Sequence, residues 1–210
     1  MDQINIFQAA ASETDSPAGT ETPDVVFFDL ETQRTFEEVG GRDNFHLLGL
    51  AVAVVYSART GEFEVYRESQ GPELVRRLLQ AAAVVGFNVI KFDYAVLRPH
   101  GGDLLVSAPT LDLMVELEGP LGHRIGLDAV GAATLNMGKT ADGLQSVRWY
   151  REGEIDRIIE YCRADVDVTR RVFEYGLRHG EVFYHDRRGV KRRVEAPWST
   201  DRYHRLYASA

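Results

Sequence analysis

The sequence is poor in cysteine and has no long apolar run. Among its 210 residues only Cys162 is a cysteine, so no internal disulfide can form, which suits a reducing compartment. The longest apolar run, Leu47 to Tyr56, is about half of what a membrane-spanning helix needs. No basic region followed by an apolar one opens the chain, so we expect no signal peptide, no membrane contact and a cytoplasmic protein.

Several catalytic and metal motifs are also missing. The six histidines show no metal-ligand spacing, which together with the single cysteine argues against a zinc site. No Gly-x-Ser-x-Gly is present to indicate a serine hydrolase.

Basic charge is not in excess either. Residues 1–24 hold five acids and no Lys or Arg, so they carry −5 of the net charge of −8 and leave −3 for the remainder. Charge alone therefore does not indicate a nucleic-acid-binding protein, although a basic groove can coexist with acids that metal ions neutralise. Small, polar and acidic residues predict a disordered tail over residues 1–23, followed by one domain over residues 24–210.

The remaining pattern predicts alternating strands and helices. The expected strands cover Val25–Leu30, Leu47–Tyr56, Phe63–Tyr66, Val84–Phe87, Val182–His185 and Val190–Val194. The expected helices cover Pro72–Ala82, Phe92–Leu97, Leu111–Leu117, Leu127–Leu135, Gly143–Tyr150 and Glu154–His179. Three hairpin-like strands, followed by helices and further strands, predict an α/β layer fold.

Two carboxylates stand at the end of the first expected strand. Asp29 and Glu31 are two residues apart, so a strand points both to the same face, with Cβ atoms about 6–7 Å apart. Two ionised carboxylates at that distance repel by about 2–3 kcal/mol at an effective dielectric constant of about 20. A shared proton, a basic partner or a divalent metal would offset this cost. The alternative is that the strand simply emerges into solvent at Asp29.

A third carboxylate faces the core from the long expected helix. At 100° per residue, Asp165 falls inside the apolar arc between Ile158 and Val172, and Tyr161 lies one turn before it on the same side. A core-facing carboxylate is costly unless it is paired, hydrogen-bonded or metal-bound. A fourth acid, Asp93, lies near the start of an expected helix, where the helix dipole alone could favour it.

Together these residues resemble the three motifs of the DEDD superfamily of 3′–5′ exonucleases, which have a ribonuclease-H-like fold. The motifs are Asp29-Leu30-Glu31, Asn88-x-x-x-Phe92-Asp93 and Tyr161-x-x-x-Asp165, within a resemblance over about residues 24–180. Tyr161 is similar to the tyrosine branch, because the histidine branch would have His where this chain has Glu160. The likeness is strongest to bacterial DNA-polymerase-B-like exonuclease domains, some of which accompany helicases.

The resemblance implies a mixed sheet flanked by helices and a site with two divalent ions, Mg²⁺ or Mn²⁺. Asp29 would bridge the ions, Glu31 and Asp165 would complete the site of the attacking water, and Asp93 would hold the second ion. Tyr161 would orient that water. The implied substrate is a single-stranded 3′ end of DNA or RNA, and a helicase or another nucleic-acid-processing protein is a candidate partner.

Other polar residues are candidates for substrate contacts. Asn88 either touches substrate or caps the following turn, and Arg124 and Lys139 are candidates to grip a phosphate. Asp112 is a candidate helix cap or a neighbour of the site, outside the expected metal ligands. The basic run within residues 186–193 is either a solvated surface or a nucleic-acid contact.

Three alternatives to an exonuclease stay open from the sequence. One is an endonuclease on the same fold, and another is a nucleic-acid-binding or adaptor domain with a catalytically weak site. The third is a phosphotransferase with an aspartyl nucleophile, whose usual Asp-x-Asp pattern would need an aspartate where this chain has Glu31.

Overall fold

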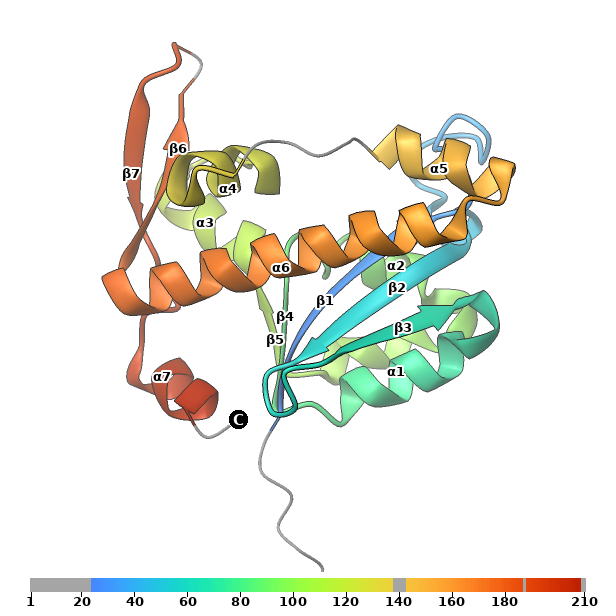
Figure 1. Ribbon diagram of the computed structural model, residues 1–210, viewed down its shortest axis with the longest axis horizontal. Helices are drawn as coiled ribbons and strands as arrows, with labels where there is room; N and C mark the ends of the chain where they lie inside the picture. Colours follow the sequence, from blue (N-terminus) through green and yellow to red (C-terminus); the bar gives the residue numbers. More distant parts are fainter. Residues whose placement is uncertain (1–23, 138–142, 187, 209–210) are drawn as a thin grey trace, which may run out of the picture.

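A five-stranded mixed sheet is the centre of the computed structural model, which describes residues 24–137, 143–186 and 188–208 (Figure 1). Its strands are β1 (Val25–Thr32), β2 (Leu50–Ser57), β3 (Phe63–Arg67), β4 (Ala83–Gly86) and β5 (Thr110–Asp112). Their order is β3-β2-β1-β4-β5; β2 runs antiparallel to its neighbours β1 and β3, and β4 runs parallel to its neighbours β1 and β5. The predicted α/β fold is confirmed; the predicted tail lies outside the described residues.

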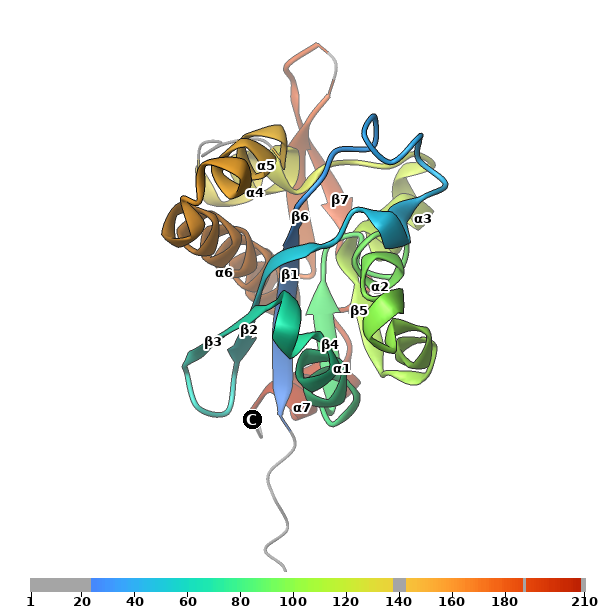
Figure 2. The ribbon, with the colours of Figure 1, turned by 90° about the vertical axis from the view of Figure 1, so that its right-hand side faces the viewer.

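Helices cover both faces of this sheet. They are α1 (Gly71–Leu79), α2 (Asp93–Val96), α3 (Leu113–Leu121), α4 (Leu127–Leu135), α5 (Gly143–Glu152), α6 (Ile155–His179) and α7 (Asp201–Ala208). Figure 2 shows α6 on one side of β1 and α1 and α2 on the other. Within the described residues, no helix is both long and apolar enough to cross a bilayer.

The alternation of β1 explains the two layers. Val25 and Phe27 pack into the core under α6, whereas Val26 and Phe28 pack into the core that α1 and α2 cover. A strand in the middle of a sheet needs apolar residues on both faces, which is why this segment is a continuous apolar run until Asp29.

A second, two-stranded sheet follows α6 and consists of β6 (Glu181–His185) and β7 (Lys191–Glu195). The chain then returns to α6 through Trp198, which is 1% exposed and donates from Nε1 to the carbonyl oxygen of Phe173 at 3.0 Å. The ring lies directly on Gly176, where a Cβ atom would be 2.5 Å from the indole. Glycine at this position therefore allows the close approach of ring and helix.

The structure corrects three details of the predicted elements. Residues Thr110–Asp112 form strand β5, and the helix predicted over Leu111–Leu117 begins only at Leu113. Strand β2 begins at Leu50, since Gly49 has a φ of +71° and a 3₁₀ turn precedes it. Helix α7 was not predicted, because its short, polar sequence has too few turns to show a clear helical period.

Candidate active site

Three carboxylates meet at the end of β1. Ligand oxygens of Asp29, Glu31 and Asp165 all lie within 4.8 Å of one another. Alternation along β1 turns Asp29 and Glu31 towards α6, and the helical period of α6 turns Asp165 towards β1. Because β1 continues to Thr32 and Glu31 is only 8% exposed, the alternative of a strand emerging into solvent at Asp29 is wrong.

Burial and the charges of neighbouring acids raise the pKa of two of these carboxyl groups, those of Asp29 and Glu31. Burial, and then the negative charges of Asp93, Asp165 and Glu31, raise the pKa of Asp29 well above its usual value. Burial raises the pKa of Glu31 to about 8, against the opposing effect of a hydrogen bond from Ser146. The metal-free site therefore holds protons at neutral pH, and a cation has to displace them.

Asp93 is the fourth acid and begins α2, as predicted, but the helix dipole does not account for it. Asp93 is only 2% exposed, and its Oδ1 has no hydrogen-bond partner among the described residues. Burial and the charge of Asp112 raise the pKa of Asp93 to about 8, although backbone N–H groups of Asp93 and Leu30 donate to it. A buried carboxylate oxygen without a partner is the arrangement that a bound cation would satisfy.

Tyr161 lies one turn before Asp165 on α6, and its hydroxyl hydrogen-bonds with the Asp165 carboxylate. Burial, followed by the negative charges of Asp165, Glu31 and Asp29, raises the pKa of Tyr161. The phenol therefore stays protonated and keeps a hydroxyl proton to donate at the edge of the acidic cluster.

Two further residues hold the carboxylates and were not predicted. The Ser146 hydroxyl on α5 donates to Glu31 Oε2 at 2.5 Å, and Cys162 Sγ on α6 lies 3.3 Å from the Asp29 carbonyl oxygen and 3.6 Å from its Oδ2. Cys162 could have been found, because it lies on the same arc of α6 as Asp165. Ser146 gives no such signal, because the sequence does not show which strand α5 covers.

All four acids line one cavity of about 580 Å³. Arg34 is the cation among the described lining residues, and its Nη1 donates to the carbonyl oxygen of Leu47. Phe36 and Phe92 form part of the apolar wall and meet edge to face, with ring centroids 6.1 Å apart. The cavity thus combines an acidic floor with exposed aromatic surface.

Asn88 also lines this cavity, in the loop between β4 and α2. It has a left-handed φ of +69°, and its Oδ1 accepts a hydrogen bond from Arg124 Nη2 at 2.5 Å. The Asn88 carbonyl oxygen accepts from the Phe92 N–H at 3.0 Å and closes the turn that follows it, while no side chain caps α2, whose N-cap is Phe92.

Asp112 fixes the same loop. Its carboxylate accepts from the backbone N–H groups of Asn88, Ile90 and Met114 at 2.7, 3.0 and 3.1 Å. The last of these bonds caps α3, as predicted, and the first two position the loop that carries Asn88 and leads to Asp93. Lys139, the other predicted phosphate contact, lies outside the described residues.

The sequence matches the family model RNase_H_2, of the RNase_H superfamily, over residues 26–176. The chain belongs to the RNase_H superfamily. That match spans β1, the β4–α2 loop and nearly all of α6, which are the segments that carry the four acids and Tyr161. No curated protein sequence that was searched matches the chain.

Among solved structures, this RNase_H superfamily member is similar to the family B DNA polymerase from the hyperthermophilic archaeon Pyrobaculum calidifontis. The TM-score is 0.54 at 17% identity, over 74% of this chain and 25% of that one. The likeness is one of fold, and the chain spans only a quarter of the polymerase.

The described residues fit divalent cations. Hard cations such as Mg²⁺ and Mn²⁺ prefer carboxylate oxygens, and Glu37 joins the four acids in the cavity lining, so that five carboxylates face the single described cation, Arg34. The partnerless Oδ1 of Asp93 and the close approach of the other three acids both suit cation binding.

Proposed function

We propose that the protein is a metal-dependent 3′–5′ exonuclease of the tyrosine branch of the DEDD superfamily. It would hydrolyse phosphodiester bonds from a single-stranded 3′ end of DNA or RNA and release nucleoside 5′-monophosphates. The observation that carries the proposal is the convergence of Asp29, Glu31, Asp93 and Asp165 on one cavity, from three separate segments of the chain. A helicase partner and a cytoplasmic location stay predictions.

Each acid has a role that its surroundings support. Asp29 interacts electrostatically with all three other acids, which suits a ligand shared between two ions. Glu31 and Asp165 would hold one of these ions, and the partnerless Oδ1 of Asp93 would hold the other. Mg²⁺ or Mn²⁺ bound there would supply a water that ionises near neutral pH and would offset charge on the phosphate oxygens.

Tyr161 is assigned to orient the attacking water. Its hydroxyl is anchored by Asp165, and the raised pKa of the phenol keeps the donor proton in place. A fixed donor beside the reacting water contributes through orientation, for which small displacements are costly.

The aromatic wall supports a single-stranded substrate. Phe36 and Phe92 are half-buried at the cavity and offer edges and faces on which the unstacked bases of a single strand can lie. The likeness to part of a DNA polymerase supports a nucleic-acid substrate. The direction of digestion rests on the resemblance of the three motifs.

A single digestion panel tests this function. Single- and double-stranded DNA and RNA, labelled at either end, are incubated with Mg²⁺, Mn²⁺ or EDTA, together with a circular single strand. We expect stepwise shortening from the 3′ end that EDTA abolishes, and no cutting of the circle. Cutting of the circle would indicate the endonuclease, and intact substrates together with strand binding would indicate the adaptor domain.

Matched variants on one helix connect the activity to the site. Asp165→Asn removes a charge that faces Asp29, whereas Asp167→Asn removes a charge paired with Arg170 and Arg171. We expect loss of cleavage for the first variant alone. Equal activity of the two variants would exclude Asp165 from the reaction.

A further inference from the structure

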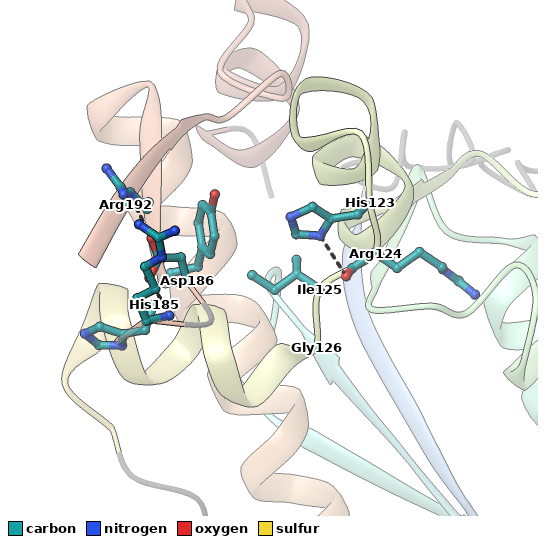
Figure 3. A pocket seen from close by; sticks show the side chains of 9 residues that line it. His123, Arg124, Ile125, Gly126, His185, Asp186 and Arg192 are labelled. Carbon is teal, nitrogen blue, oxygen red and sulfur yellow. Dashed lines mark hydrogen bonds and ion pairs between the residues drawn. The ribbon is translucent and has the colours of Figure 1, made fainter. Parts of the chain in front are cut away.

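A second cavity, of about 620 Å³, lies between the β6–β7 hairpin and the loop over residues 122–126 (Figure 3). The hairpin contributes Tyr184, Arg188 and Arg192, and the loop contributes His123. Its volume is that of a pocket for a ligand the size of a nucleotide. None of these residues belongs to the acidic cavity.

The charge of this cavity is opposite to that of the whole chain. Arg124, Arg188 and Arg192 line it, and Asp186 is the acid among the described lining residues. Arg192 Nε pairs with Asp186 Oδ2 at 2.9 Å, while the side chain of Arg188 is exposed. The Arg124 guanidinium bonds Asn88 and lies 3.7 Å from Glu118, so Arg188 and Arg192 outnumber Asp186 by one in the cavity. On a chain of net charge −8 this local positive charge favours an anionic ligand, and guanidinium groups match phosphate geometry.

Aromatic rings lie beside these cations. His123 and Tyr184 face each other across the cavity, with ring centroids 6.3 Å apart and nearly perpendicular planes. Figure 3 shows the His123 ring directed from the loop towards the hairpin. Interleaved cations and rings are the combination that binds single strands, because phosphates meet the cations and bases stack on the rings.

Arg124 connects this cavity to the acidic one. In Figure 3 its side chain extends from the loop away from the hairpin side chains. Its Nη2 donates to Asn88 Oδ1, and Asn88 lines the cavity of the four acids. The loop thus separates the two cavities, and Arg124 reaches across it.

We propose that the hairpin cavity binds a single strand of nucleic acid on the 5′ side of the cleavage site. Arg188 and Arg192 contact phosphates, His123 and Tyr184 contact a base, and the strand passes Arg124 and Asn88 to reach the four acids. The proposal rests on the proposed function for the position of the 3′ end, but strand binding itself requires no cleavage.

Fluorescence anisotropy of labelled single strands in EDTA tests this path. The variant carries Arg188→Ala and Arg192→Gln, and its control is Arg76→Ala, an exposed arginine of α1 on the opposite face of the sheet. For strands of about 12 nucleotides, long enough to reach both cavities, we expect the variant to bind about tenfold more weakly than wild type and control. The slope of log affinity against log salt should fall by about 1 to 1.5 for two lost phosphate contacts. DNA and RNA of the same sequence show which sugar is preferred.

Equal affinity and equal salt slope of variant and wild type for the long strand would overturn the proposal, as would a wild-type protein that binds no strand. Hydrolysis of the p-nitrophenyl ester of thymidine 5′-monophosphate with Mn²⁺ tests the chemistry of the acidic site separately, because this substrate contains a single nucleotide. Arginine-dependent binding without this hydrolysis would support the hairpin path and contradict the exonuclease.

Discussion

The hydroxyl of Ser146 on α5 donates a 2.5 Å hydrogen bond to Oε2 of Glu31 on β1, and both side chains are buried. This bond lowers the pKa of Glu31 against the larger effect of burial. The bond also holds Oε2 of Glu31 in place, which fixes the orientation of the carboxylate. The position of α5 over the end of β1 therefore sets where the other oxygen, Oε1, lies. Ser146 is therefore a positioning residue for a candidate metal ligand.

Replacement of this hydroxyl should weaken the site without unfolding the chain. We expect Ser146→Ala to lower activity about ten- to a hundredfold, because Glu31 loses the donor that orients it. The Mn²⁺ concentration at half-maximal activity should rise as well. Arg148→Ala, an exposed change on the same helix, serves as the control. Wild-type activity and metal dependence in Ser146→Ala would show that the bond has no part in the reaction.

Tyr161→Phe tests the orientation of the attacking water. The variant keeps the ring that packs against Trp149 and loses only the hydroxyl that bonds with Asp165. We expect kcat to fall about a hundredfold, with little change in KM or thermal stability. A rise in KM with constant kcat would instead assign Tyr161 to substrate binding.

The stability of the metal-free protein should depend on pH in an unusual direction. Glu31 and Asp93 have a pKa of about 8 in the folded chain, against about 4 when unfolded, so the folded state binds more protons between these values. Stability is then fully present below about pH 4 and is lost as the pH rises towards about 8. We expect the Tm in EDTA to fall across this range.

Added Mn²⁺ should reverse this loss, because metal ligands must be deprotonated. The rise in Tm on adding Mn²⁺ should be larger at pH 8 than at pH 5.5, because fewer protons have to leave Glu31 and Asp93 at the higher pH. Asp93→Asn should flatten the pH dependence in EDTA, since it removes one of the carboxyl groups with a raised pKa. A Tm that is constant with pH in EDTA would contradict the raised pKa of Glu31 and Asp93 in the folded chain.

Gly176→Ala tests the close packing of the Trp198 ring on α6. The new methyl group would lie 2.5 Å from the Trp198 ring, so ring and helix would have to separate. We expect the free energy of unfolding to fall by about 1–3 kcal/mol, as in other overpacked cores. Denaturant unfolding followed by tryptophan fluorescence measures it. Unchanged stability would mean that Trp198 moves aside at no cost.

Periodicity explains which parts of this molecule could be predicted. A period of two placed Asp29 and Glu31 on one face, and a period of 3.6 placed Asp165 and Tyr161 on the core side of a long helix. The RNase H-like fold is what the resemblance to the three DEDD motifs implies, and the sheet order and the family match confirm it. Strand β5 was missed because three residues are too few to show a period.

Contacts between distant segments could not be predicted in this way. The bond between Arg124 and Asn88 joins two loops 36 positions apart, and it depends on the left-handed backbone of Asn88. The bond from Ser146 to Glu31 depends on where α5 packs. Neither loop conformation nor helix placement leaves a repeating pattern in the sequence, so only the structure shows these pairs.

We propose that the acidic cluster drives metal-dependent removal of nucleotides from a 3′ end. The most direct measurement follows a 5′-labelled single strand on a sequencing gel, with wild-type protein and Asp29→Asn side by side in Mn²⁺. We predict a ladder that shortens from the 3′ end with wild type, and none with a folded Asp29→Asn variant or with EDTA. A ladder that persists in EDTA or with Asp29→Asn would contradict the claim.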